Sequence, residues 1–275
     1  MIGAIIGDIA GSRFEFDNYR AKDFELFAAD CRVTDDGIMT LAVARAIMEM
    51  ERLADAAGLR GDDRLALAAD MTVRWMREIG RKYPDCGYGG MFARWMFSDD
   101  PRPYGSFGNG AAMRVGPVGF AARTEEEVRK LSRAVTGVTH NHPEGLKGAE
   151  AVATAVFLAR RGAGKDEIRE LIERDYYPLD FTLDEIRHVY RFDGTCQGTV
   201  PQAIRAFLEA VSFEDAIRNA VSIGGDSDTV AAIAGSIAEA FYGVPDELRE
   251  KALTYLDDEL RAICEDWSVF VGKRS

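Results

Sequence analysis

Long stretches with apolar residues at helical spacing, each bounded by capping or helix-stopping residues, constrain the fold of this chain more than any other feature. Residues 38–57 contain neither Gly nor Pro and end at Gly58, a residue typical of helix C-termini. Residues 65–80 continue the helical periodicity. Alternating strand patterns are nearly absent. The sequence therefore predicts an all-α fold.

Capping signals mark further helices. Thr124 with Glu127, and Ser212 with Asp215, have the spacing of a capping box, in which a hydroxyl and a carboxylate each accept a backbone N–H. A helix rich in small residues is expected over residues 228–242, where Gly and Pro follow. A chain with this many helices needs only short loops between them, and those loops can carry functional residues.

The first residues, MIGAIIGDIAG, resemble a strand followed by a glycine loop, but their spacing favours a helix. Gly3, Gly7 and Gly11 recur every four residues and would share one helix face, where a neighbouring helix can approach closely. Neither GxGxxG nor GKS/T follows, which excludes the Rossmann and P-loop interpretations. The segment also lacks the basic start of a signal peptide.

Composition limits the partners and the compartment. The 275 residues carry a net charge of −12, so nucleic acid is an unlikely ligand and an anionic membrane has no attraction for the chain. The four cysteines are far apart and form no CxxC pair, which suits a reducing, cytoplasmic location. No repeat or linker interrupts the sequence, so we expect a single domain over residues 1–275.

Two acidic motifs stand at predicted helix starts. They supply six oxygen-bearing candidates for metal binding: Thr34, Asp35, Asp36, Asp226, Asp228 and Thr229. In the loop before a helix these side chains can turn toward one point, and the two glycines before Asp226 give that backbone freedom. A purely structural alternative is that each Asp or Thr is an N-cap.

If both motifs converge with Glu15, five carboxylates share one cleft. Two like charges about 4 Å apart repel by about 4 kcal/mol at an effective dielectric of 20, so five cannot stay ionised together without cations. Two divalent cations would oppose that charge. Oxygen ligands without His or Cys select hard ions, Mg²⁺ first and then Mn²⁺ or Ca²⁺.

A glycine-rich loop over residues 105–110 is the next unusual stretch. Small residues there expose backbone N–H groups, and a helix is expected directly after the loop, so both features suit a phosphate. Phe107 is available to stack on a base. A tight structural turn explains the loop equally well, and the second loop at residues 88–90 is a weaker signal.

His140 and His142 form a His-x-His pair that could bind a metal. The pair has no third nitrogen or sulfur ligand nearby, which argues against zinc. Hydrogen bonding to a ligand hydroxyl, or a structural role, is the favoured interpretation of these histidines.

The motifs occur in the order GDIAGSRFE, TDD, GSFGNGAAMR, TH and GGDSDT. In this order the sequence resembles the ADP-ribosylglycohydrolase family from residue 1 to about residue 245. The resemblance implies a single-domain orthogonal helix bundle with a central binuclear Mg²⁺ or Mn²⁺ centre. It further implies hydrolysis of the bond between ADP-ribose and a modified protein or a small conjugate.

By matching positions, the resemblance assigns Thr34, Asp35, Asp36, Asp226, Asp228 and Thr229 to the metals. It assigns catalysis to Glu15, Asp35 and Asp36. It assigns the ADP-ribose site to Tyr88, Gly89, Gly90, Ser106, Phe107, Gly108, Asn109, Gly110 and His140, with Phe107 against adenine. Glu15 or Asp36 would then deprotonate a water or protonate the leaving group.

One position departs from the family pattern. The first motif is usually Thr-Asp-Asp-Thr, whereas Gly37 stands fourth here. A lost hydroxyl beside a metal ligand is worth about 10–100-fold in affinity or activity. Two other functions therefore stay open: a catalytically weak or inactive ADP-ribose-binding or structural protein on the same fold, and a two-metal hydrolase of phosphoesters.

Overall fold

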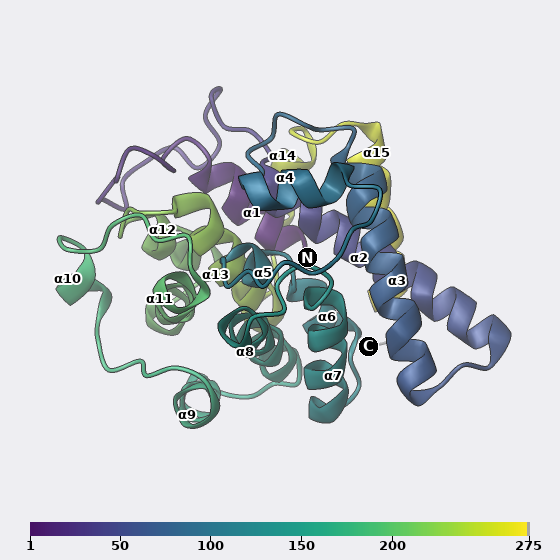
Figure 1. Ribbon diagram of the computed structural model, residues 1–275. Helices are drawn as coiled ribbons and strands as arrows, with labels where there is room; N and C mark the ends of the chain where they lie inside the picture. Colours follow the sequence, from purple (N-terminus) through teal and green to yellow (C-terminus); the bar gives the residue numbers. More distant parts are fainter. Residues whose placement is uncertain (274–275) are drawn as a thin grey trace.

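The computed structural model describes residues 1–273, and α-helices pack in it around one hydrophobic core (Figure 1). The helices are α1 (Ile2–Gly11), α2 (Asp35–Ala57), α3 (Gly61–Gly80), α4 (Gly90–Phe97), α5 (Gly110–Met113), α6 (Gly116–Ala121), α7 (Glu125–Thr136), α8 (Pro143–Arg160), α9 (Lys165–Asp175), α10 (Leu183–Ile186), α11 (Cys196–Glu209), α12 (Phe213–Val221), α13 (Ser227–Tyr242), α14 (Asp246–Leu253) and α15 (Asp258–Gly272). Within residues 1–273, extended pairing is limited to an isolated bridge between Gly108 and Thr195. The predicted all-α fold is confirmed.

Helices α1 and α13 form the centre of the molecule. Every residue of α1 is buried, and α13 is its main packing partner. Gly3 and Gly7 lie against the backbone of Gly235 and Ala231, where a Cβ on either glycine would overlap a carbonyl oxygen. The predicted glycine face therefore exists, and it brings the start of α13 beside the end of α1. No helix in the described part of the chain is long and apolar enough for a membrane span.

Helix α2 packs beside α3 and crosses the same core (Figure 1). It ends as predicted, because Gly58 adopts the left-handed conformation with φ +69°. Helix α3 begins four residues earlier than its apolar periodicity indicates. Asp62 and Asp63 stand in its first turn, where their charge favours the helix N-terminus.

The predicted caps form with a small difference. The Thr124 hydroxyl accepts the N–H of Glu127 at 3.1 Å, but the Glu127 carboxylate accepts the N–H of Arg123 rather than that of Thr124. The pair Ser212 and Asp215 behaves in the same way. Each carboxylate thus accepts the N–H of the residue before the N-cap, whereas in a capping box it accepts the N–H of the N-cap itself.

The helix expected after the glycine-rich loop is only one turn long, α5. Pro117 stands in the first turn of the next helix, α6, and its missing N–H and fixed ring prevent α5 from continuing through it. The loop has no long helix dipole behind it, and the N–H groups of Gly105, Gly108 and Asn109 already donate within the protein.

Candidate metal centre and ligand cleft

The starts of α2 and α13 meet the end of α1 at a buried acidic floor. Carboxylate oxygens of Asp8, Asp36 and Asp228 lie within 4.8 Å of one another, and a second group joins Glu15 and Asp226 to Asp228 under the same limit. The four aspartates are buried and Glu15 is half-buried. Asp228 therefore links two overlapping carboxylate clusters.

Helix initiation places the first motif. Thr34 is the N-cap of α2, and its hydroxyl accepts the N–H of Asp36 at 3.4 Å. The sequence analysis expected Asp35 and Asp36 in the loop before the helix. They lie instead in the first turn of the helix. The residues that begin α2 are therefore also residues of the acidic floor.

The second motif follows a sharp turn. Gly224 and Gly225 have φ of +71° and +74°, a conformation that other residues rarely adopt. Asp226 is the N-cap of α13, and Asp228 lies in its first turn. The motifs converge because two helices begin at the same place in the core.

Burial and mutual repulsion disfavour the charged form of these groups. Burial raises the pKa of Asp8, Asp36 and Asp226 well above the ordinary range, and the Asp228 carboxylate adds to each rise. The pKa of Asp228 is also raised by burial. Without added positive charge, the floor cannot hold all its carboxylates ionised.

Two further carboxyl groups have pKa values near neutral pH. Burial raises the pKa of Glu15 to about 7, with repulsion from Asp228 as the next cause. Burial and Asp228 also raise the pKa of Asp35 to about 7. Both groups can therefore exchange a proton near pH 7, as a general acid or base must.

The donor set fits a hard cation. Asp36 Oδ1 is buried without a hydrogen-bond partner, whereas Asp36 Oδ2 accepts the Thr229 hydroxyl at 3.1 Å. Among residues 1–273, no Lys or Arg forms an ion pair with the floor aspartates. An orphaned oxygen among unbalanced carboxylates is a place where a divalent cation can bind.

Asp8 belongs to the acidic floor and was not among the residues that the sequence analysis predicted. Its Oδ1 accepts the Thr34 hydroxyl at 2.5 Å, and its Oδ2 accepts the backbone N–H groups of Thr34 and Gly37, both at 3.0 Å. The available signal was a lone charged residue in the otherwise apolar α1. A charge in such a place needs partners, and these are 26–29 residues away in the sequence.

A cleft of about 500 Å³ opens above the floor. Its size is ordinary for a small-molecule site. Most of the predicted residues line it: Glu15, Asp35, Asp36, Asp226, Asp228, Thr229, Gly89, Gly90, Ser106, Gly108, Asn109, Gly110 and His140. Thr34 is buried beneath them.

Tyr88 and Phe107 are not among the lining residues. Tyr88 packs on Phe92 with ring centroids 5.2 Å apart and points its hydroxyl at the Gly80 carbonyl. Phe107 is 43% exposed and lies beside His142, with ring centroids 5.2 Å apart. Tyr88 thus lies behind the residues that line the cleft, and Phe107 lies at the outer edge of the cleft.

The glycine-rich loop is fixed to the floor and to a second segment. Asn109 Nδ2 donates to Asp226 Oδ2 at 2.7 Å and to the Thr199 hydroxyl at 3.1 Å. The Asn109 N–H donates to the Gly194 carbonyl at 2.8 Å. The Asn109 side chain therefore lines the cleft and also holds Asp226 in place.

His140 is held as a neutral imidazole. Its Nδ1 lies 2.7 Å from the Thr139 hydroxyl and 3.2 Å from Arg114 Nη2. Burial and the Arg114 charge lower the His140 pKa well below its usual range. Arg114 itself is buried and lines the cleft, and the sequence analysis assigned it no role. His142 instead caps α8 by accepting the N–H of Glu144 at 3.1 Å.

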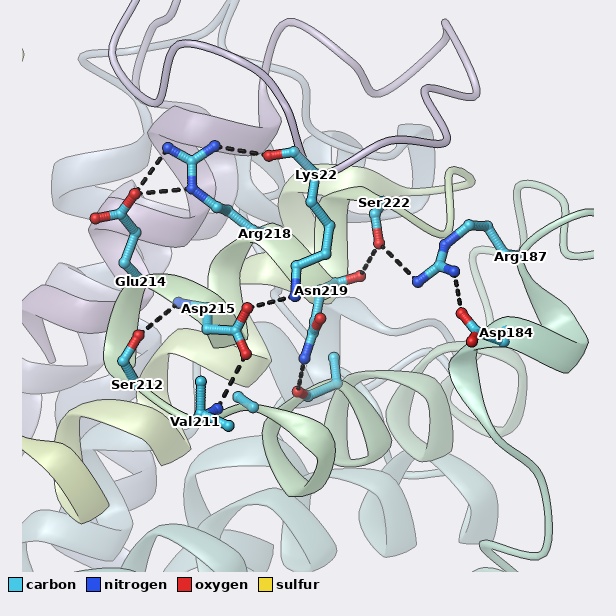
Figure 2. A network of polar contacts seen from close by, with 12 residues as sticks. Lys22, Asp184, Arg187, Val211, Ser212, Glu214, Asp215, Arg218, Asn219 and Ser222 are labelled. Atoms are coloured by element: carbon cyan, nitrogen blue, oxygen red, sulfur yellow. Dashed lines mark hydrogen bonds and ion pairs between the residues drawn. The ribbon is translucent and has the colours of Figure 1, made fainter.

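The loop that carries Glu15 is fastened to α12. Figure 2 shows Lys22 paired with Asp215, and Arg218 of the same helix donating to the Lys22 carbonyl at 2.8 Å. This network fastens the chain at Lys22, seven residues after Glu15, to α12.

Comparison with known proteins identifies the family. The family described as ADP-ribosylglycohydrolase matches residues 1–274. The chain is 26% identical to ADP-ribosylhydrolase ARH3 of Bos taurus, over 83% of this chain and 76% of the relative. It is 28% identical to ADP-ribosylarginine hydrolase Tri1 of Pseudomonas putida (strain GB-1), over 91% of this chain and 72% of the relative.

A solved structure titled ADP-ribosylglycohydrolase-related protein complex superposes with a TM-score of 0.65. It is 25% identical in sequence, and the match covers 95% of this chain and 94% of that chain. The similarity in sequence and the similarity in fold thus agree over nearly the whole length. The chain belongs to the ADP-ribosylglycohydrolase family.

Proposed function

We propose that this glycohydrolase depends on two divalent cations, Mg²⁺ or Mn²⁺, and releases ADP-ribose from a protein arginine or serine side chain or a related conjugate. The observation that carries the proposal is the unpartnered Asp36 Oδ1 among carboxylates that no cationic side chain balances. The family supports the ADP-ribose part of the proposal, and the donor chemistry supports the metal part.

Six side chains would hold the cations: Thr34, Asp35, Asp36, Asp226, Asp228 and Thr229. When bound, divalent cations neutralise the floor and help to orient the ribose hydroxyls and a water molecule. Thr229 keeps Asp36 in place through its hydroxyl, and Asn109 does the same for Asp226. Two of the six ligands, Asp36 and Asp226, thus have a partner that fixes their orientation.

The family resemblance gives proton transfer to Glu15, Asp35 and Asp36. Cleavage of the glycosidic bond needs a base for the attacking water and an acid for the leaving group. Glu15 lines the side of the cleft and is half-buried, so a proton can reach it from solvent. We assign the exchange of protons with water or leaving group to Glu15, with Asp35 or Asp36 as the second carboxylate.

The diphosphate would lie against the glycine-rich loop. Ser106, Gly108 and Gly110 line the cleft without long side chains, so a ligand can approach this loop closely, and the Gly108 N–H donates to the Ser106 hydroxyl at 3.1 Å. Arg94 and Arg114 also line it and can offset the charge of two phosphates. Phe107 would meet adenine only at the outside edge, where its ring is exposed.

The target is an ADP-ribosylated protein or a small ADP-ribose conjugate. The name of the Pseudomonas relative specifies ADP-ribosylarginine, so an arginine conjugate is the first substrate to try. Loops over residues 13–27 and 82–88 would select the target, since Glu15 and Gly87 from these loops reach the cleft. Four free cysteines support a reducing, cytoplasmic location.

The test is the release of free ADP-ribose from mono-ADP-ribosylated arginine and serine peptides, with Mg²⁺, with Mn²⁺ and with a chelator. We expect release from one peptide with a metal present and none with the chelator. Full activity in chelator would contradict the metal dependence. Release from neither peptide, together with ADP-ribose binding, would favour a different linkage or a catalytically inactive ADP-ribose-binding protein.

A further inference from the structure

We propose that Arg114 is a positioning residue for His140, and that it fixes the imidazole as the tautomer with its proton on Nε2. His140 then presents a permanent N–H to the cleft and acts as a hydrogen-bond donor to a ligand oxygen. That this oxygen belongs to ADP-ribose rests on the proposed function. The tautomer itself follows from the contacts around the ring.

The Nδ1 atom of His140 has two polar neighbours that differ in their hydrogen-bonding capacity. Arg114 Nη2 lies 3.2 Å from Nδ1, and the Thr139 hydroxyl lies 2.7 Å from it. A hydroxyl can donate or accept, so Thr139 is compatible with either tautomer. A guanidinium has only donors, so Arg114 is compatible only with a lone pair on Nδ1. With the proton on Nδ1, two N–H groups would face each other across this short distance.

Arg114 is held in this position by its own contacts. Its Nη2 also donates to the Thr139 hydroxyl at 2.6 Å, and its guanidinium carbon lies 5.4 Å from the centre of the Phe92 ring. The side chain is buried, with 2% of its surface exposed. Because a guanidinium keeps its proton in proteins, the donor beside Nδ1 is permanent.

The other ring nitrogen, Nε2, faces the glycine-rich loop. A Cβ at position 110 would lie 3.3 Å from Nε2, and a Cβ at position 108 would lie 3.6 Å from it. Both glycines line the cleft, and so does His140. Within residues 1–273, Nε2 forms no hydrogen bond with a protein acceptor, whereas Nδ1 has two polar neighbours. A mostly buried donor in such a place favours a ligand oxygen as its partner.

This arrangement separates His140 from the groups that exchange protons. A general base needs a lone pair directed at the reacting proton. The lone pair of His140 is on Nδ1 and is directed at Arg114 and Thr139, while Nε2 carries a proton. Burial and the Arg114 charge also hold the pKa of His140 well below its usual range, so the ring takes up no second proton near pH 7. His140 therefore binds the ligand, and the proposed proton transfer stays with the carboxylates.

The direct test of the tautomer is nitrogen NMR of the protein labelled with ¹⁵N-histidine at pH 7. Correlation of the ring nitrogens with the ring C–H protons shows which nitrogen carries the proton, and His140→Gln identifies the signals of His140. We expect Nε2–H in the wild-type protein. Thr139→Val should keep Nε2–H, because Arg114 still faces Nδ1. Arg114→Met should allow the Nδ1–H form, because Nδ1–H can then donate to the Thr139 hydroxyl.

Three spectra would overturn the tautomer or the role of Arg114. Nδ1–H in the wild-type protein would overturn the tautomer without any variant. Nε2–H as complete in folded Arg114→Met as in the wild-type protein would overturn the role of Arg114. If Arg114→Met fails to fold, Thr139→Val tests the same role, because Arg114 is then the remaining polar neighbour of Nδ1. Nδ1–H in Thr139→Val would show that Arg114 does not fix the tautomer.

The donor role is tested by calorimetric binding of ADP-ribose to His140→Phe and His140→Gln. Phe keeps a ring without an N–H, whereas Gln keeps a side-chain N–H. We expect the Kd to rise about 10-fold in His140→Phe, the size of one lost hydrogen bond, and to rise less in His140→Gln. His188→Phe makes the same change at an exposed histidine outside the cleft lining and should leave the Kd unchanged. A wild-type Kd in His140→Phe would overturn the donor role.

ADP serves as a second probe, because it has the diphosphate and lacks the distal ribose. Weaker binding of both ADP and ADP-ribose to His140→Phe would place the acceptor oxygen in the diphosphate. Weaker binding of ADP-ribose alone would place it in the distal ribose. Both results support the donor role of His140.

Failure of the proposed reaction gives a different pattern. If no conjugate releases ADP-ribose while His140 carries Nε2–H and His140→Phe binds ADP-ribose weakly, the proposed reaction is wrong and the roles of His140 and Arg114 stand. If conjugates are hydrolysed while wild-type His140 carries Nδ1–H, the inference is wrong and the proposed function stands. A wild-type chain that binds no ADP-ribose would overturn the donor role.

Discussion

Two parts of this molecule bury carboxylates, and they treat the charge in opposite ways. In α8, the Glu150 carboxylate accepts from Arg129 at 3.0 Å, from Arg133 at 2.7 Å and from the Tyr176 hydroxyl at 3.1 Å. At the cleft floor, carboxylates of α1, α2 and α13 face one another, and no Lys or Arg in the described part of the chain pairs with them.

The difference separates a carboxylate that the protein itself balances from carboxylates that it leaves without an opposite charge. Around Glu150 the chain itself supplies the opposite charge, so the site is complete on folding. At the floor, burial and repulsion raise the pKa values, and no Lys or Arg among residues 1–273 pairs with these carboxylates. Unbalanced buried charge at a cleft is a sign of function with a physical cause.

The largest effect should come from Asp228→Asn, because Asp228 belongs to both carboxylate clusters. Loss of a partner of a metal ligand is worth about 10–100-fold, so loss of a ligand should weaken Mn²⁺ binding and ADP-ribose release at least about 100-fold. Mn²⁺ calorimetry and the peptide release assay measure both. If Asp228→Asn keeps its helical circular dichroism and releases ADP-ribose at the wild-type rate, the floor carboxylates would not differ in function from Glu150.

The opposite pattern is expected for Glu150→Gln. Loss of the Glu150 charge should cost on the order of 1 kcal/mol, because Arg129 and Arg133 are partly exposed and Arg129 keeps its ion pair with Asp175. Urea unfolding should show this loss of stability. Since Glu150 lies outside the cleft lining, kcat should not change. A large fall in kcat with unchanged stability would show that the two regions are not separate.

The metal-free protein should lose stability as the pH rises. Asp35 ordinarily titrates at 3.8, and burial raises its pKa in the folded state to about 7. The folded state therefore binds more protons than the unfolded state between about pH 4 and pH 7, and the free energy of unfolding falls across this window. The effect is on the order of 1 kcal/mol for each unit of pKa shift.

Urea unfolding at pH 5, 6, 7 and 8, in chelator and in Mn²⁺, measures this effect. Bound cations should remove the fall, because they favour the ionised floor. Equal pH dependence with and without Mn²⁺ would show that the floor carboxylates do not respond to cations.

The smallest effect belongs to the cleft edge, away from both clusters. Phe107→Leu removes an exposed ring that could stack on adenine, which is worth about 1 kcal/mol. KM for the ADP-ribosylated peptide should rise several-fold with kcat unchanged, as initial-rate kinetics would show. An unchanged KM would mean that adenine binds elsewhere in the cleft.

The helices and the acidic motifs could be predicted because their signals are local. Helical periodicity and the stop at Gly58 fix α2, and the four-residue glycine spacing indicates how closely α1 packs. Both acidic motifs carry their own turn residues and capping residues, so their place at helix starts follows from a few neighbouring positions.

The remaining features depend on packing between distant segments. Asp8 looks like an ordinary interruption of an apolar run, and its role appears only when α1 lies beside the start of α2. The sequence likewise does not show that Tyr88 turns toward Gly80, or that Phe107 turns out beside His142. Side-chain direction in a glycine-rich loop is decided by tertiary contacts and not by the loop's own residues.

The most direct test of the central claim is a calorimetric titration of chelator-treated wild-type protein with Mn²⁺. The unbalanced floor predicts two ions bound per chain, with binding lost in Asp228→Asn and kept in Glu150→Gln. Mn²⁺ binding by the wild-type protein no stronger than that of Asp228→Asn would contradict it, and the buried carboxylates would then need another source of positive charge.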